Sequence, residues 1–239
     1  MILNKYINKY NMSYNDYLNK RKSIDVNWDK MDQWPLYVGV YNLARSIHNQ
    51  DLIRNSVDVP GHIAEFGSWR GSNAILMAKT LSIFSSFSQK KVISFDLFSD
   101  GLDFFDEKDK DSIMFKGKYD GDYHHLKEII ELFQLNDKVE LVKGNILETL
   151  PAYIDDNNPF FSLIYVDTDL YKTTDLILKS LHNRLSIGGV FVFDEWNFKE
   201  FPGESQGVKE FLDQRGNCYE MISVKNSKQP SLILKKIKN

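Results

Sequence analysis

From Gly61 onward, the apolar positions of the chain alternate between two spacings. Runs that are apolar almost throughout, such as KVISFDL at 91–97 and FSLIYVD at 161–167, are typical of strands buried on both faces. Between such runs lie segments with helical spacing, of which 126–133 is the clearest. Strands that alternate with helices predict an α/β protein with a mostly parallel sheet covered by helices on both faces.

The pattern predicts strands at 61–67, 91–97, 139–145, 161–167, 190–195, 218–224 and 231–237, and helices at 71–85, 122–134, 173–185 and 207–216. The stretch 146–160 contains Pro151 and is expected to be a loop. Too few residues separate the last two strands for a helix, so these two must be antiparallel. Ligands of such sheets bind at the carboxyl ends of the strands.

The N-terminal part follows a different pattern. Residues 1–30 are polar and have two interpretations, a mobile arm or helices that dock late in folding. Trp34–Ser56 predicts one amphipathic helix whose apolar face carries Leu36, Val40, Leu43 and Ile47. We therefore expect an N-terminal helical extension at 1–56 and a core domain at 57–239. Within the core, the acidic, glycine-punctuated segment 98–121 is predicted to be a lid.

Composition mainly excludes alternatives. The net charge of −3 implies no general attraction to nucleic acid or to an anionic membrane. The lone Cys218 excludes an internal disulfide and a paired zinc site, and no apolar stretch is long enough to span a bilayer. The N-terminus is too polar for a signal peptide, which predicts a cytoplasmic protein.

A glycine-containing turn, EFGSWRG from Glu65 to Gly71, joins the first strand to the next helix. Gly67 can adopt backbone angles closed to other residues, which lets a ligand approach the main chain. The start of the helix offers free N–H groups, suited to a carboxylate or phosphate. The turn lacks the P-loop pattern and the full three-glycine dinucleotide fingerprint. An ordinary tight turn is the alternative interpretation.

Asp96 ends the second strand, in VISFDLF. In nucleoside-binding folds an acid at this place accepts hydrogen bonds from the ribose hydroxyls. A solvated acid at a strand end is the alternative. Together, the glycine turn and Asp96 favour nucleoside binding more than either feature does alone.

Four carboxylates, Asp167, Asp169, Asp194 and Glu195, follow two strands that are otherwise nearly all apolar. Adjacent parallel strands lie about 4.8 Å apart, so these side chains are expected to converge. Without a cation they would repel one another, or one would be protonated. Oxygen ligands of this kind suit a hard divalent ion such as Mg²⁺. Separate salt bridges to lysine or to helix N-termini are the alternative.

Histidines and aromatics near these motifs have two interpretations. His124 and His125 are adjacent and would point in different directions on a helix, so one of them could face the cleft as a base or as a ligand of a hydroxyl group. We assign that role to His124, with surface exposure or packing as the alternative. Trp69, Tyr171 and Trp196 could line the site or simply pack.

Six stretches in order resemble the macrocin O-methyltransferase family: GHIAEFGSWRGSNAILMAKTL, VISFDLFSDG, VELVKGNILETLP, IYVDTDLYKTT, LSIGGVFVFDEWN and PGESQGVKEFL. The resemblance covers residues 34–234. Members are class I S-adenosylmethionine-dependent enzymes that methylate hydroxyls of sugars and related natural-product rings and require Mg²⁺. The resemblance implies a Rossmann-like fold with strand order 3-2-1-4-5-7-6, a catalytic domain at 57–239 and a substrate cap at 1–56.

The resemblance also implies roles for individual residues. The cofactor-binding residues would be Glu65, Gly67 and Ser68 in the turn, Trp69, Ser72 and Asn73 at the methionine carboxylate, Asp96 at the ribose, Gly144, Asn145 and Ile146 at the adenine, and Asp167. The metal ligands would be Asp167, Asp194 and Glu195, with Asp169 as general base. The family usually has two successive aspartates where this chain has Asp194 and Glu195, and the extra methylene of Glu195 changes the geometry there.

The function expected from the resemblance is metal-assisted transfer of a methyl group from S-adenosylmethionine, which becomes S-adenosylhomocysteine, to a sugar or glycan hydroxyl. A homo-oligomer is plausible for the family. A catalytically degenerate relative that binds a nucleoside or a partner protein is the alternative, favoured by Glu195. A dehydrogenase using NAD is disfavoured by the missing glycines.

Overall fold

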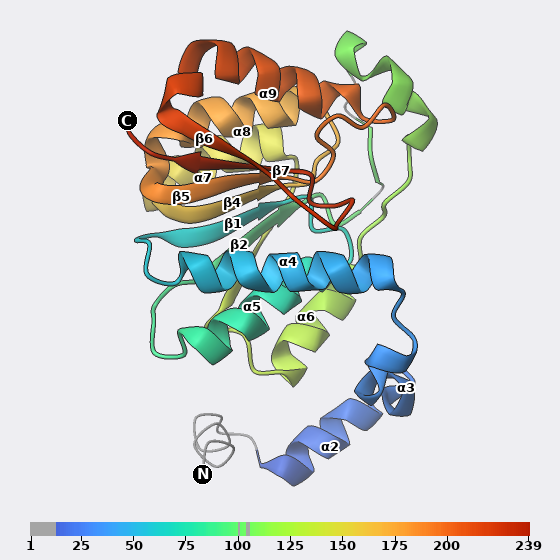
Figure 1. The fold of residues 1–239 in the computed structure, drawn as a ribbon. Helices are drawn as coiled ribbons and strands as arrows, with labels where there is room; N and C mark the ends of the chain where they lie inside the picture. The colour runs from blue at the N-terminus through green and yellow to red at the C-terminus, as the bar shows by residue number, and fades with distance from the viewer. Residues whose placement is uncertain (1–12, 100, 104–105) are drawn as a thin grey trace.

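Within the residues that the structure describes, 13–99, 101–103 and 106–239, seven strands form one sheet in the order β3-β2-β1-β4-β5-β7-β6 (Figure 1). The computed structural model gives the strands as β1 His62–Phe66, β2 Val92–Asp96, β3 Val139–Lys143, β4 Phe161–Val166, β5 Leu185–Phe193, β6 Tyr219–Ser223 and β7 Leu232–Lys236. The first five pair in parallel, whereas β7 is antiparallel to β5 and to β6. The predicted fold class and strand order are confirmed.

Helices cover both faces of this sheet (Figure 1). On one face lie α4 (Val40–Ser56), α5 (Ser72–Phe84) and α6 (Tyr123–Leu132), and on the other lie α7 (Ile146–Asn157), α8 (Tyr171–Leu181) and α9 (Pro202–Arg215). Each layer has its own apolar core, one containing Ile53, Met77 and Leu81 and the other Leu178 and Phe211. The strands are therefore buried on both sides, as their continuous apolar sequences predicted.

Helix α7 corrects the loop predicted at 146–160. The Asn145 side chain accepts a hydrogen bond from Leu147 N and so caps the start of the helix. Ile146 and Leu150 are buried against the sheet. Pro151 lies inside the helix and removes one backbone hydrogen bond. Burial of the apolar face stabilises the helix despite that loss, because helices in proteins depend on tertiary packing more than on local propensity.

The N-terminal extension is also different from its prediction. A 3₁₀ turn, η1 (Trp34–Leu36), precedes α4, so Trp34–Ser56 is not one helix. Leu36 and Val40 are 74% and 83% exposed, whereas Ile53 is fully buried. The predicted apolar face is therefore wrong at its beginning. Two short helices, α2 (Tyr14–Lys22) and α3 (Trp28–Asp32), come before η1, and the first twelve residues of the extension lie outside the described residues.

Two boundaries nearer the chain's end also differ from their predictions. Helix α8 ends at Leu181 and is followed by η3 (His182–Arg184), and β5 already begins at Leu185 rather than at 190. The Gly-Gly pair that was expected to end the helix lies inside the strand, where Gly189 passes so close to β4 that an added Cβ would lie 2.9 Å from Ser162 O. A further turn, η4 (Gly216–Cys218), follows α9.

The segment predicted to be a lid contains the 3₁₀ helix η2 (Glu107–Phe115), which lies beside α9 (Figure 1). Residues 100, 104 and 105 of that segment are outside the described residues. Asp109 fastens η2 to α8 by accepting a hydrogen bond from Tyr171 N at 2.9 Å.

Among the helices described, none combines the length and the apolar character that a bilayer span requires.

Candidate functional site

A cavity of about 440 Å³ lies at the edge of the sheet where the chain leaves the first five strands. Its lining includes Gly67 after β1, Asp96 at the end of β2, Asn145 after β3, Asp167 after β4 and Asp194 after β5. Parts of the predicted lid and of α4 complete its walls. The pattern of strands and helices predicts a ligand site at this same edge.

The turn after β1 is shaped by a close approach to β4. Gly67 has φ +87°, and a Cβ added there would lie 1.7 Å from the carbonyl oxygen of Asp167. Gly71, at φ +78°, precedes α5, whose first turn has its free N–H groups at this end. Only glycine fits the first position, since a side chain would meet both a steric clash and an unfavourable φ.

Behind this turn lies a buried polar cluster. Glu65 accepts a hydrogen bond from Ser94 Oγ at 2.7 Å, and Ser94 is in turn hydrogen-bonded to Ser68. Burial raises the pKa of Glu65 to about 7. Neither Glu65 nor Ser68 lines the cavity, so the structure places them beneath the turn rather than on its ligand side.

Asn73 in the first turn of α5 contacts the N-terminal extension. Its Oδ1 accepts a hydrogen bond from Asn49 Nδ2 at 2.8 Å, while its own buried Nδ2 has no hydrogen-bond partner among the described residues. Ser72 beside it is exposed, and neither residue is part of the cavity lining. Trp69, from the same predicted set, does line the cavity.

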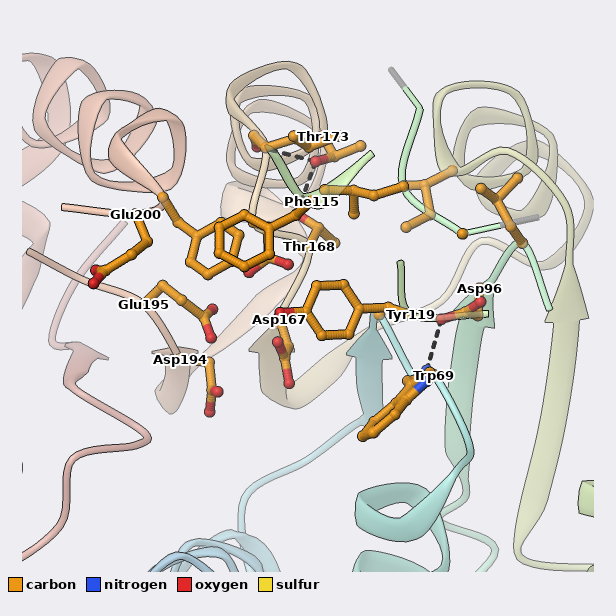
Figure 2. A pocket seen from close by; sticks show the side chains of 18 of the residues that line it. Trp69, Asp96, Phe115, Tyr119, Asp167, Thr168, Thr173, Asp194, Glu195 and Glu200 are labelled. Carbon is orange, nitrogen blue, oxygen red and sulfur yellow. Dashed lines mark hydrogen bonds between the residues drawn. The ribbon is translucent and has the colours of Figure 1, made fainter. Parts of the chain in front are cut away.

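Asp96 is held by main-chain amides. Trp69 N donates to its Oδ2 at 2.8 Å (Figure 2), and Phe98 N donates to its Oδ1 at 2.7 Å. Burial nevertheless raises the pKa of Asp96 above its ordinary value. Each carboxylate oxygen has a second lone pair, so the group can still accept hydroxyl hydrogen bonds from a ligand. Asn145 and Ile146 line the cavity after β3, and Gly144 precedes them with φ +138°.

Three carboxylates converge at the ends of β4 and β5 (Figure 2). One oxygen each from Asp167, Asp194 and Glu195 lies within 4.8 Å of the other two. Tyr165 OH donates a hydrogen bond to Asp194 Oδ1. Burial, and secondarily the charge of Asp194, raises the pKa of Asp167 well above its usual range. The predicted convergence of acids is thus present in the structure.

Arg45 of α4 reaches into this cluster. Its Nη2 donates to Asp167 Oδ2 at 2.8 Å and lies 3.0 Å from Asp194 Oδ2. The second distance is an ion-pair contact without hydrogen-bond direction, because Asp194 Oδ2 accepts no hydrogen bond in the described structure. A guanidinium from the N-terminal extension therefore offsets part of the buried negative charge.

Glu195 is held from two further places. Gln229 Nε2 donates to Glu195 Oε1 at 2.6 Å, and Tyr41 OH on α4 donates to Gln229 Oε1. The backbone N–H of Glu195 donates to Glu204 Oε1 of α9 at 3.0 Å, which brings a further buried acid next to the cluster. Glu195 Oε2 is buried and has no partner in the part of the chain described.

Asp169 follows β4 and lines the cavity beside these acids. Its φ of 63° is left-handed, a conformation that aspartate tolerates better than most residues. Burial, with a smaller contribution from the charge of Asp194, raises the pKa of Asp169 to about 7. A carboxyl group with this pKa can exchange a proton near neutral pH.

Aromatic rings from the predicted lid form part of the cavity wall. Phe115 and Tyr119 both line it, with ring centroids 6.2 Å apart (Figure 2). Tyr119 also meets Trp69 edge-on at 5.9 Å, and Phe115 meets Phe201 at 4.8 Å. The segment therefore touches both the Gly67 turn, at Trp69, and the chain that leads into α9, at Phe201.

His124 does not join the site. Its side chain is exposed on α6, whose buried face carries Leu126 and Ile130 instead, and it is not part of the cavity lining. The base role predicted for His124 is therefore set aside. Tyr171 and Trp196, considered as possible walls, also stand outside the lining; the Tyr171 hydroxyl donates to Glu210 Oε2 at 2.7 Å.

The residues that sequence reasoning missed lie mainly on α4. Tyr41, Arg45 and Asn49 are four positions apart, so they form one polar stripe along the helix. The spacing of these three residues is visible in the sequence, but the apolar residues between them favour another face of the helix as the buried one. Gln229 and Glu204 carried no comparable signal, because their contacts depend on how the hairpin and α9 fold back.

The chain matches one family model and resembles several solved structures. The family model described as macrocin O-methyltransferase matches residues 9–227. CalS11, a calicheamicin methyltransferase, is 21% identical with a TM-score of 0.77, and the match covers 96% of this chain and 95% of that one.

Two further solved structures are similar. The O-methyltransferase NovP is 20% identical with a TM-score of 0.70 over 82% of this chain and 80% of its own. An O-methyltransferase from Bacillus cereus, in complex with S-adenosylhomocysteine, is 16% identical with a TM-score of 0.57 over 100% of this chain and 98% of that one. A search of curated proteins returned no match. At these identities the solved structures show a shared fold.

Proposed function

Because the chain belongs to the macrocin O-methyltransferase family, we propose that it transfers the methyl group of S-adenosylmethionine to a hydroxyl of a sugar or glycosylated metabolite. The sugar is suggested by CalS11, one structure of which is described as a TDP-rhamnose 3'-O-methyltransferase. The observation that carries the proposal is that the Gly67 turn, Asp96 and the carboxylate cluster all line the same cavity. A cofactor turn alone would serve many reactions, whereas the adjoining acids suit a reaction at a hydroxyl.

S-adenosylmethionine would lie along the turn after β1. Asp96 would accept hydrogen bonds from the ribose, and Asn145 and Ile146 would flank the adenine. The free N–H groups at the start of α5 suit the methionine carboxylate. Glu65 and Ser68 support the turn from beneath.

The three converging acids fit a hard divalent cation such as Mg²⁺. They offer oxygen ligands within 4.8 Å of one another, and two buried oxygens, Asp194 Oδ2 and Glu195 Oε2, accept no hydrogen bond from any described residue. Asp167, Asp194 and Glu195 would hold the ion. When bound, a divalent ion orients a hydroxyl group and lowers its pKa.

Asp169 is the proposed general base. It lines the same cavity, and its pKa of about 7 lets it accept a proton from the acceptor hydroxyl near neutral pH. Holding the oxygen in line with the methyl group would contribute several of the roughly 7–11 kcal/mol available from ideal positioning. Phe115 and Tyr119 would exclude water from this space, which supports the lid role of 98–121.

Two further expectations are retained as proposals. The first is a homo-oligomer, supported by the exposed apolar side chains that precede and begin α4, namely Trp34, Leu36, Tyr37 and Val40. Sedimentation or light scattering of the purified chain measures the oligomeric state. The second is a cytoplasmic location, supported by the lone Cys218, which has no cysteine to pair with and so fits a reducing compartment.

Calorimetry with S-adenosylmethionine and S-adenosylhomocysteine, with Mg²⁺ and with chelator, tests the proposed function. We expect micromolar binding of both in either condition, followed by methylation of some member of a panel of nucleotide-activated deoxysugars and glycosides only when Mg²⁺ is present. Absence of cofactor binding in both conditions contradicts the methyltransferase. Methylation that persists in chelator contradicts the proposed metal site but not the proposed methyl transfer.

A further inference from the structure

The acid cluster already has a cation of its own. Arg45 Nη2 donates to Asp167 at 2.8 Å and lies 3.0 Å from Asp194, so one nitrogen bridges two of the three proposed metal ligands. Asp194 is almost completely buried and Asp167 is one-quarter exposed, so both contacts are poorly screened by water. The guanidinium stands beside the same carboxylate oxygens that an ion would use.

The third acid is tied to the same helix. Tyr41 precedes Arg45 by one helical turn, and its hydroxyl donates to Gln229, whose side chain donates to Glu195 at 2.6 Å. Helix α4 thus contacts Asp167 and Asp194 directly and Glu195 through one intermediary. A single face of the N-terminal extension contacts the whole cluster.

A guanidinium and a divalent cation cannot both keep these contacts. An ion held by Asp167 and Asp194 would place two positive charges within a few ångströms of the Arg45 guanidinium, and such repulsion is strong at a buried site. The arginine would have to withdraw, and α4 or the side chain would move with it. Binding of the ion and seating of α4 are therefore expected to oppose each other through Arg45.

We propose that Arg45 is the resident counter-ion of the acid cluster, which a divalent cation must displace, so that Arg45 weakens metal binding and makes it depend on the position of α4. The inference rests on the metal site in the proposed function. It assigns to the extension a part in setting metal affinity, besides any contact it makes with the acceptor.

The test compares Mn²⁺ binding, followed by the paramagnetic resonance of free Mn²⁺, in the full-length chain and in R45Q, R45K and R54Q. We expect R45Q to bind Mn²⁺ about tenfold or more tightly than the unmodified chain, because the competing charge is gone. R45K keeps the charge and should stay within about threefold of the unmodified chain. Arg54 is an exposed arginine on the same helix, and R54Q should leave the affinity unchanged.

Thermal unfolding of the same variants provides a second readout. Without metal, R45Q removes the counter-ion of the buried Asp194 and the partly buried Asp167, so its Tm should fall. Added Mn²⁺ should raise the Tm of R45Q by more than that of the unmodified chain. Mn²⁺ affinity in R45Q equal to or below that of the unmodified chain overturns the inference. S-adenosylmethionine binding, measured in the same samples, reports separately on the proposed function.

Discussion

Gly67 and Asp167 approach each other so closely that a Cβ at position 67 would lie 1.7 Å from the carbonyl oxygen of Asp167. The contact joins the ends of β1 and β4 and brings the glycine turn next to the acid cluster. The main chain here is shared between the proposed cofactor site and the proposed metal site. A change at either residue is therefore expected to reach both sites.

Replacing Gly67 with alanine should disturb both proposed sites. The clash, together with the cost of about 1–3 kcal/mol for a strained left-handed residue, forces the strand ends apart. We expect G67A to lower the free energy of unfolding by more than about 2 kcal/mol, measured by urea denaturation, and to lose measurable S-adenosylmethionine binding. G39A is the matched control, since Gly39 has φ −70° and an added Cβ would meet nothing within 4 Å. Equal stability of the two variants would contradict the close approach.

Asp169 should be needed for turnover but not for cofactor affinity. D169N keeps the shape of the side chain and removes its ability to accept a proton, so methylation should fall by about 10²–10⁴. Burial and the charge of Asp194 raise the pKa of Asp169 to about 7 in the metal-free protein, and a bound cation would lower this pKa, so turnover of the unmodified chain should rise with pH at or below pH 7. Initial rates from about pH 5.5 to 8.5 measure this limb. Unchanged turnover in D169N would remove the assignment.

Glu65 should make the fold less stable as the pH rises. Burial raises its pKa from 4.5 to about 7, so the folded protein holds a proton that the unfolded chain releases. The stability associated with the protonated group is complete below pH 4.5 and is lost as pH rises through 7. As the pH rises from about 5 to about 8, the free energy of unfolding of E65Q should increase by on the order of 2 kcal/mol relative to that of the unmodified chain. Urea denaturation at each pH measures this, with exposed Glu220→Gln as control; parallel pH profiles would refute it.

Asp109 should hold the predicted lid against α8. Its buried carboxylate accepts hydrogen bonds from Tyr171 N at 2.9 Å and Asp106 N at 2.8 Å. D109A leaves both donors unpaired and should cost about 1–2 kcal/mol of unfolding free energy. We also expect faster trypsin cleavage after the lysines of η2, followed by mass spectrometry. D111A, at an exposed position two residues on, should be cleaved at the original rate; matching rates in the two variants would mean that Asp109 does not fasten the segment.

Much of the fold was predictable because the strands are continuous apolar runs, most of the intervening segments have helical spacing, and the last two strands are too close in sequence for a helix between them. The acid cluster was predictable for the same reason, since Asp167 and Asp194 end adjacent strands. Helix α7 was missed because Pro151 argues locally for a loop, while the burial that stabilises the helix depends on the sheet beneath it.

The face of α4 was misjudged for a different reason. Helical spacing identifies several candidate faces, and the apolar residues Leu36, Val40 and Ile47 favour one that is largely exposed. The helix turns Arg45 and Asn49 inward because their partners, Asp167 and Asn73, are distant in sequence and carry the compensating charge and hydrogen bond. Such pairings exist only once the sheet has formed.

The polar stripe on α4 also limits how relatives of this chain can be recombined. A cut between residues 56 and 57 would separate the N-terminal extension from the core domain. Tyr41, Arg45 and Asn49 lie in the extension, yet each contacts a side chain of the core domain. A chimera that borrows another protein's extension to reach a new acceptor would also import a new charge balance for the acids. Specificity and catalytic competence would be inherited together in such a chain.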